Sequence, residues 1–163
     1  MKVVFVEQDR CLACRECERV CSFQESGGFK RENANIWVNI DLEQRTIFTM
    51  TCLHCEDAAC MEICPTSAIK RDPKTRAVTV DDSECVGCRM CVEACPFGCI
   101  HFEINRRVAV KCNLCDGDPK CVKNCMAGAL HYGNINELAA IKRGKIDKTL
   151  VRIAQFHKGE YRR

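Results

Sequence analysis

Apolar and polar residues alternate in several short segments of the chain, which is the pattern of half-buried β-strands. Each segment ends at polar or turn-forming residues and is too short for an ordinary helix. We expect strands at residues 3–7, 36–40, 46–50, 100–104 and 108–111. Two more short strands are expected within residues 67–80, around the turn signal Asp72-Pro73. The pattern therefore predicts a body of short strands joined by turns.

Two other segments have a different character. Residues 22–35 are polar and contain Gly27-Gly28, so we expect a surface loop there. From residue 134 the chain has no cysteine, and residues 137–142 and 145–158 have helical periodicity. We expect two helices, broken at Gly144. The chain thus divides into a body, residues 1–133, and a helical tail, residues 134–163.

The tail is amphipathic and basic. Ile146, Leu150, Ile153, Ala154 and His157 fall on one helical face, and basic residues fall largely on the other. From residue 137 onward, eight lysines and arginines stand against three acidic residues. Such a helix either packs on its own body or docks on another protein. We expect the tail to hold a neighbouring subunit, either a catalytic partner or a second copy of this chain.

Composition changes the picture of the core. The hydrophobic fraction is 47% of 163 residues, but this figure includes 17 cysteines. Without them roughly 37% of the residues remain to form an apolar core, which is thin for a chain of this length. Small domains with too little apolar burial are usually held together by disulfides or metals. We therefore expect the cysteines to hold this fold together.

The expected compartment favours metal ligands over disulfides. The first ten residues contain only a four-residue apolar run, far short of a secretory signal, and no segment is apolar enough to span a membrane. These features predict a cytoplasmic protein with no direct membrane insertion. Thiols in that compartment stay reduced and are more often metal ligands.

Sixteen of the cysteines form four groups with a repeated spacing. The quartets are Cys11, Cys14, Cys17 and Cys21; Cys52, Cys55, Cys60 and Cys64; Cys85, Cys88, Cys91 and Cys95; and Cys112, Cys115, Cys121 and Cys125. Every quartet opens with C-x2-C and closes with C-x3-C, and two of them are followed by proline, at Pro65 and Pro96. Cys99 is left over.

This spacing favours iron-sulfur clusters over zinc. Zinc sites usually separate two C-x2-C pairs by a dozen or more residues, whereas here the third cysteine follows within three to six residues. The bacterial ferredoxin run is C-x2-C-x2-C-x3-C-P, which the third quartet matches in full. We expect four [4Fe-4S] clusters, each with complete cysteine ligation.

The clusters also change the expected charge. The formal net charge is +3, and four clusters with their thiolates add about −8 when oxidised. The loaded protein is then mildly acidic, which argues against a nucleic-acid partner.

The fourth cysteine of each quartet has a separate role. About one helical turn beyond the third ligand, on an expected short helix, it points toward a neighbouring cluster. Quartets therefore work in pairs. The second and third form the clearest pair, which leaves the first and fourth to enclose them; sequential pairing, first with second and third with fourth, is the alternative. Nested pairing gives modules 1–51 with 100–133, and 52–99.

Residues 1–133 resemble the four-cluster ferredoxin subunits of molybdenum or tungsten oxidoreductases, as in the dimethyl sulfoxide reductase group. The likeness lies in residues 85–91 (CVGCRMC), 95–98 (CPFG) and 128–133 (GALHYG). It implies an α+β fold of duplicated bacterial-ferredoxin-like modules. It also implies four ligand sets: Cys11, Cys14, Cys17 and Cys125; Cys112, Cys115, Cys121 and Cys21; Cys52, Cys55, Cys60 and Cys95; and Cys85, Cys88, Cys91 and Cys64. The first and fourth quartets depart from the pattern, with Ser22 and Met126 where proline is usual.

The resemblance implies a non-catalytic electron-transfer subunit. Its partners would be a catalytic subunit with a molybdenum or tungsten cofactor and a second redox protein, such as a flavin or NAD-linked subunit. The short spacers and residues 25–29 are most similar to the small subunit of bacterial tungsten aldehyde oxidoreductases. The alternatives are a hydrogenase, carbon monoxide dehydrogenase, formate dehydrogenase or sulfoxide reductase. We expect Cys99 to be a buried small residue, and His54, inside the second cluster loop, to influence that cluster through a hydrogen bond.

Overall fold

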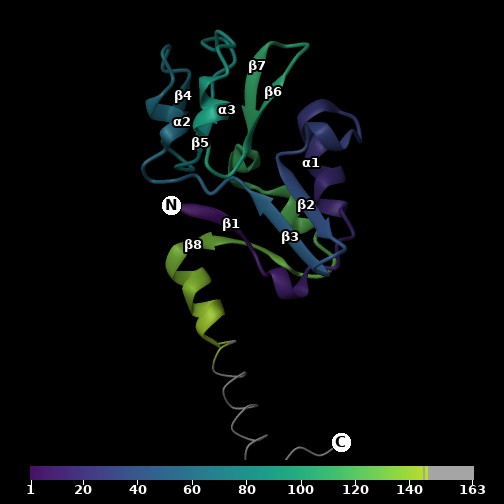
Figure 1. Cartoon of the computed structure of the whole chain (residues 1–163). Coiled ribbons are helices and arrows are strands. Elements are labelled where there is room, and N and C mark those ends of the chain that lie inside the picture. The colour runs from purple at the N-terminus through teal and green to yellow at the C-terminus, as the bar shows by residue number, and fades with distance from the viewer. Residues whose placement is uncertain (145, 147–163) are drawn as a thin grey trace, which may run out of the picture.

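The structure, a computed structural model, describes residues 1–144 and 146. In this part of the chain every sheet is a pair of antiparallel strands (Figure 1). The pairs are β1 (Lys2–Val6) with β8 (Leu130–Asn134), β2 (Ile36–Asp41) with β3 (Thr46–Thr51), β4 (Ile69–Arg71) with β5 (Val78–Val80), and β6 (Ile100–Glu103) with β7 (Val108–Lys111). Only the first pair joins distant parts of the chain, so it brings the two ends of the body together.

Short helices lie between the strand pairs. They are α1 (Glu16–Ser26), α2 (Ala59–Glu62), α3 (Met90–Ala94) and α4 (Lys120–Lys123), with 3-10 turns η1 (Gln8–Arg10), η2 (Arg31–Asn33) and η3 (Leu114–Gly117). Helix α1 contacts α4, and α2 contacts α3. The helix pairs therefore follow the nested order of the quartets. The helices of the first and fourth quartets are in contact, and so are those of the second and third.

The buried residues form two small cores. The first joins Val4 and Val38 from the start of the body to Leu114 and Leu130 from its end. The second consists of Ala58, Ile69, Val78, Cys91, Ile100 and Ala109. Both cores are lined by cysteines, and no Phe, Trp or Tyr in the described part of the chain is fully buried. The apolar residues surround the cysteine sites and form no separate hydrophobic interior.

The predicted module boundary at residue 99 needs a correction. Strands β6 and β7, which that boundary assigns to the outer module, contribute Ile100 and Ala109 to the second core. Strand β7 contacts β5, and β6 contacts α3. The hairpin packs here because its apolar face continues the one formed by Ile69 and Val78.

The α+β prediction of short strand pairs and helices is confirmed, and the predicted strands lie within a residue of β1, β2, β3, β6 and β7. The loop predicted at residues 22–35 is partly wrong, because α1 continues to Ser26 and ends at Gly27, which has φ +67°. The amide of Gly27 bonds to the carbonyl of Phe23, a C-terminal cap that suits glycine. Strand β8 was not predicted, since its sequence LHYGN contains glycine and does not alternate clearly.

The first part of the tail is tied to the body. Residues 135–144 are helical, and the break predicted at Gly144 is not seen at that residue, which is part of the helix. Asn134 caps the helix, because its Oδ1 accepts the amides of Asn136 and Glu137, each at 3.0 Å. Leu138 is buried. The second predicted helix, residues 145–158, lies outside the described residues except for residue 146.

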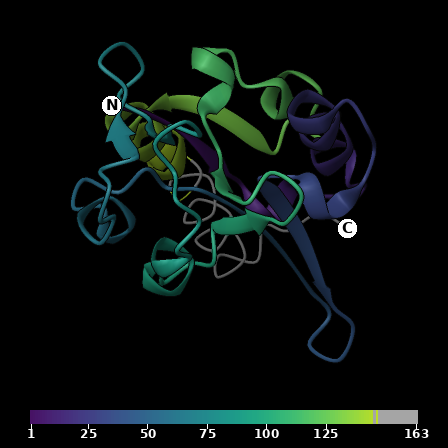
Figure 2. The ribbon, with the colours of Figure 1, turned by 90° about the horizontal axis from the view of Figure 1, so that it is seen from above.

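Figure 2 shows the hairpin of β2 and β3 extending away from the body. Near its tip, Leu42 and Phe48 are exposed. The base of this hairpin supplies Ile36 and Val38 to the first core, so its inner end is anchored beside the cysteines while its outer end is free of them.

Candidate metal centres

The sixteen cysteines of the quartets line four separate cavities. We name these site A (Cys11, Cys14, Cys17 and Cys125), site B (Cys21, Cys112, Cys115 and Cys121), site C (Cys52, Cys55, Cys60 and Cys95) and site D (Cys64, Cys85, Cys88 and Cys91). Each cavity has the first three cysteines of one quartet and the fourth cysteine of the partner quartet. The groups that meet at each cavity are those of the nested pairing.

The loop that carries the first two cysteines has the same backbone bend in all four quartets. The residue just before the second cysteine has positive φ in each: Ala13 at 52°, His54 at 48°, Gly87 at 71° and Leu114 at 59°. Only glycine adopts this conformation without steric cost, and the other residues lose about 1 kcal/mol or more. Strain of this kind persists where surrounding bonds impose the conformation. The repeat therefore marks four loops shaped for a common purpose.

Backbone amides point at several of the cysteine sulfurs. The amides of His54 and Leu114 donate to Cys52 Sγ and Cys112 Sγ, each at 3.4 Å. The amides four residues after Cys95 and Cys125, those of Cys99 and Ala129, donate to these sulfurs at 3.3 Å. Amide donors of this kind favour the thiolate form, which is the form that binds a metal.

The fourth cysteines do not lie where we expected them. Only Cys21 is inside a helix, α1, whereas Cys95 is the residue after α3, and Cys64 and Cys125 lie two residues beyond α2 and α4. Helices α2 and α4 are each four residues long and end before the fourth cysteine. The prediction of a helical fourth cysteine is thus wrong for three quartets, although the cysteines still reach the partner's cavity.

The donor set at these cavities fits iron-sulfur clusters. A four-iron cluster takes one thiolate for each iron, and each cavity has four quartet cysteines in its walls. Burial raises the pKa of Cys17, Cys21 and Cys112 to about 12, so binding a cluster must release protons from these thiols.

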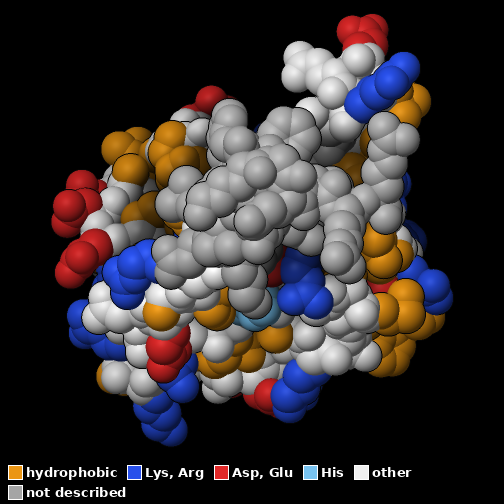
Figure 3. Space-filling view, turned by 90° about the horizontal axis from the view of Figure 1, so that it is seen from below, with side chains coloured by type: hydrophobic (Ala, Val, Ile, Leu, Met, Phe, Trp, Pro, Cys, Tyr) orange, Lys and Arg blue, Asp and Glu red, His pale blue; other side chains and the backbone are white. Residues whose placement is uncertain are grey.

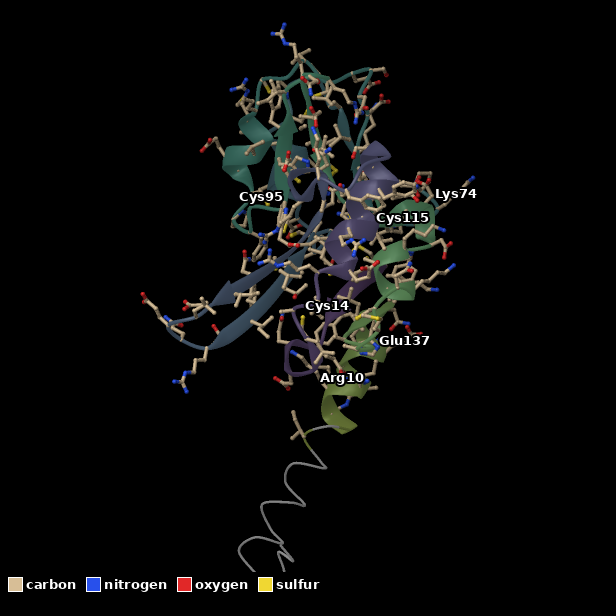
Figure 4. The ribbon with its side chains drawn as sticks, turned by 90° about the vertical axis from the view of Figure 1, so that its right-hand side faces the viewer. Arg10, Cys14, Lys74, Cys95, Cys115 and Glu137 are labelled. Atoms are coloured by element: carbon tan, nitrogen blue, oxygen red, sulfur yellow. The ribbon has the colours of Figure 1, made fainter. Side chains whose placement is uncertain are left out.

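The sites form a series. Sites A and B share the first and fourth quartets, and sites C and D share the second and third. Sites B and C meet across the two modules, where Cys112 lies near enough to Cys52 for the charge of one to raise the pKa of the other, after the larger effect of burial. In Figure 4, Cys14 of site A is labelled below Cys115 of site B and Cys95 of site C. After the larger effect of burial, the charge of Cys17 in site A raises the pKa of Cys121 in site B, and the charge of Cys60 in site C raises the pKa of Cys91 in site D. These neighbours give the order A, B, C, D.

The ends of this series reach the surface. Cys14 in site A and Cys88 in site D are the two exposed cysteines among the seventeen. Each site also has at least one buried cysteine: Cys17 in site A, Cys21 and Cys121 in site B, Cys52 in site C and Cys91 in site D. The arrangement leads from one face of the protein through its interior to another face.

Site C differs from the others in its polar side chains. His54 is fully buried, and its Nδ1 accepts the amide of Val78 at 3.0 Å. Burial, together with the positive charge of Lys111, lowers the pKa of His54 to about 3. Lys111 is only 5% exposed, and its Nζ donates to the carbonyl of Val78. Both residues line the cavity of site C.

Sequence reasoning singled out His54 but missed Lys111, since lysines are rarely buried. The residues of strand 108–111 are VAVK, so alternation puts Lys111 on the face of Ala109, opposite Val108 and Val110. The sequence pattern therefore favours the valine face as the buried one and gives no sign that Lys111 lies inside.

Cys99 also touches site C but occupies a different structural position. It is 2% exposed, and its thiol donates weakly to the carbonyl of Phe97. In the quartets that end at Cys64 and Cys125, the residue at the equivalent position is Ala68 or Ala129, and both are buried. Cys99 therefore stands where the second and fourth quartets have alanine.

Comparison with known proteins agrees with this geometry. Residues 43–135, more than half of the chain, match the family described as the 4Fe-4S dicluster domain. The chain belongs to this family. The ferredoxin motifs of a dicluster protein with sixteen grouped cysteines are consistent with four [4Fe-4S] clusters.

Three relatives of this dicluster protein are named for electron transfer or as parts of oxidoreductases. The thiosulfate reductase electron transfer subunit PhsB of Salmonella typhi is 35% identical over 117 residues, covering 68% of this chain and 60% of the relative. A component of the anaerobic dimethyl sulfoxide reductase of Escherichia coli is 30% identical over 127 residues, covering 67% and 58%. The aliphatic sulfonate oxidoreductase polyferredoxin-like subunit of Pyrococcus furiosus is 37% identical over 111 residues, covering 68% and 64%.

The chain spans between half and two thirds of the length of the curated relatives that it matches. In the described part of this dicluster protein, no helix has the length and apolar character needed to cross a membrane.

Proposed function

We propose that this chain is a non-catalytic electron-transfer subunit that carries [4Fe-4S] clusters in sites A, B, C and D. It relays electrons between a catalytic subunit with a molybdenum or tungsten cofactor and a second redox partner. One observation carries the proposal: each cavity combines three cysteines of one quartet with the fourth of its partner. Each cluster would then be fully ligated by cysteine, with no iron left open for a substrate.

The series of sites supports transfer and not catalysis. Cys14 and Cys88 bring sites A and D to the surface, where partners can exchange electrons, while sites B and C join the two ends through the interior. Backbone amides that donate to the sulfurs stabilise the negative charge that a cluster gains on reduction. The protein's part is to hold the clusters in order and shield them from water.

The named relatives favour the alternative partners over an aldehyde oxidoreductase. Their names refer to dimethyl sulfoxide, thiosulfate and sulfonate, and none of these three refers to an aldehyde. We therefore propose a catalytic partner from the wider molybdenum and tungsten group, with the tungsten aldehyde oxidoreductase as the narrower case. Purification of the chain with its bound partner, followed by assays for molybdenum and tungsten, separates these cases. A complex without either metal would contradict the proposal.

We predict about sixteen irons and about sixteen acid-labile sulfides per chain after anaerobic purification, because each of four sites holds a four-iron cluster. Colorimetric iron and sulfide assays on protein quantified by amino-acid analysis test this number. Eight or fewer irons would show that at least two cavities hold no cluster. Zinc in place of iron would contradict the iron-sulfur assignment altogether.

The tail provides a further prediction about assembly. Figure 3 shows lysine and arginine side chains around the edge of the lower face of the molecule, with apolar side chains between them. Residues 135–144 are anchored by the Asn134 cap and by the buried side chain of Leu138. Truncation after Gly144 keeps this anchor, so iron content should stay near normal while the size of the complex and electron delivery to the partner fall.

Size-exclusion chromatography and partner-coupled turnover measure the two effects of the truncation. Exchange of exposed Lys74 for Gln, far from the tail in sequence, is a matched control for a change of surface charge. Unchanged assembly and turnover would refute a docking role for the tail. Loss of clusters would instead show that the tail packs on its own body.

A further inference from the structure

The four sites differ in the charged groups that line them. Site A has Arg15 and Glu16 in its wall, site B has Glu25, and site D has Arg89. Arg15 is partly exposed, and Arg89 is exposed and lies over the ring of Phe102. In the described part of the chain, only site C has a buried lysine in its wall.

A single residue holds the polar groups of site C in place. Val78, in β5, is completely buried; its amide donates to His54 Nδ1 and its carbonyl accepts from Lys111 Nζ. Because Nδ1 is an acceptor, the neutral imidazole must carry its proton on Nε2. That nitrogen is buried and has no hydrogen-bond partner among the described residues. A cluster sulfur in site C would supply the acceptor that Nε2–H otherwise lacks.

The lysine acts by charge. An oxidised cluster with four thiolates carries about −2, and reduction by one electron makes it about −3. The ammonium group of Lys111 is in a water-poor wall, where a charge is screened little, so it stabilises the reduced form more than the oxidised form. The His54 donor acts in the same direction, because a hydrogen bond to sulfur strengthens as the sulfur becomes more negative.

We propose, on the basis of the function proposed above, that Lys111 and His54 make the cluster in site C the most easily reduced of the four. Site B, its neighbour across the modules, has Glu25 in its wall and no lysine or arginine, so no positive side chain in that wall favours reduction there. Site C is then the place where an electron rests between the two modules. Lys111 and His54 stabilise the reduced form of this cluster from outside and do not ligate iron.

A redox titration of the iron-loaded full chain with dithionite, followed by electron paramagnetic resonance, tests the proposal. Cys60→Ala removes a ligand of site C and is expected to abolish the component with the highest midpoint potential. Lys111→Gln, which keeps a donor for the Val78 carbonyl, should lower that midpoint potential by about 59 mV, a tenfold change in the one-electron equilibrium. His54→Leu should lower it as well, and His54→Gln, which can both accept and donate, should restore most of the loss.

Lys70→Gln is the matched control, because it removes the same charge from an exposed lysine paired with Glu84. Solvent screens that charge, so the shift should be less than twofold in the equilibrium. The proposal is overturned if the highest-potential component survives in Cys60→Ala, or if neither Lys111→Gln nor His54→Leu lowers it. A wild-type chain that takes up no clusters would instead refute the proposed function, so the two failures are distinguishable.

Discussion

Removal of iron and sulfide from the purified chain is expected to unfold it. The two cores consist mostly of Ala, Val, Ile and cysteine side chains, and no aromatic residue in the described part of the chain is fully buried. So little apolar burial does not outweigh the conformational entropy of about 1–2 kcal/mol for each ordered residue. The energy of the metal-thiolate bonds must therefore be part of the folding energy.

The cysteine loops make this dependence stronger. Ala13, His54 and Leu114 are held at positive φ, which the free loops would relax. Without clusters, thiols such as Cys17 and Cys112 line cavities that nothing fills. The iron-thiolate bonds that joined the two quartets of each module are then lost. The strand pair β1–β8, the contact between α1 and α4 and the small first core then link the first and last parts of the body.

Far-ultraviolet circular dichroism and thermal melting under anaerobic conditions measure the effect. The chain treated with a chelator and an oxidant, then desalted, should lose most of its ordered signal and its cooperative transition. Adding iron, sulfide and a thiol reductant back should restore both. A metal-free chain that keeps a cooperative transition near that of the loaded protein would show that the apolar cores suffice.

Local signals in the sequence predicted most of the strands because their residues alternate within single hairpins. Strand β8 was missed because its partner β1 is more than a hundred residues away, and pairing of distant segments leaves little trace in a five-residue sequence. Likewise, the extension of α1 depends on Gly27 as a cap and on Ser22, whose hydroxyl donates to the carbonyls of Gly28 and Lys30. Contacts of this kind are formed only in the folded chain.

The candidate sites show the same division. Cysteine spacing predicted the quartets, because each loop must wrap a cluster locally. It did not predict the positive φ of His54 or Leu114, since these residue types do not favour that conformation. Two hydrogen bonds of the Val78 backbone join β5 to His54, 24 residues earlier, and to Lys111, 33 residues later. No single segment of sequence contains all three.

Replacement of Cys95 by alanine is expected to remove the cluster of site C, whereas replacement of Cys99 by alanine should leave all four clusters in place. Both side chains line the same cavity, so proximity does not distinguish them. Their places in the repeat do. Cys95 closes the C-x3-C of its quartet and corresponds to Cys125, and the amides four residues later donate to both sulfurs at 3.3 Å.

Cys99 supplies one of those amides, and the corresponding donor in the other module is Ala129. Alanine at 99 keeps the backbone amide that donates to Cys95 Sγ and loses only a sulfur atom that bonds weakly to the carbonyl of Phe97 at 3.6 Å. The expected cost is that of a small buried cavity, about 1 kcal/mol. Ala68 and Ala129, buried at equivalent positions, indicate that the fold accommodates alanine there.

Iron assays on the two variants, prepared in parallel under anaerobic conditions, give the test. Cys95→Ala should contain about twelve irons or fewer, because a four-iron cluster with three thiolates and a solvent-exposed iron is easily lost. Cys99→Ala should contain about sixteen, with the absorption spectrum of the wild type. The double variant, Cys95→Ala with Cys99→Ala, shows whether Cys99 can take over as a ligand. If Cys99 replaces the missing ligand in Cys95→Ala, that variant keeps its iron and only the double variant loses it. Loss of four irons in Cys99→Ala alone would show that Cys99, and not Cys95, completes site C.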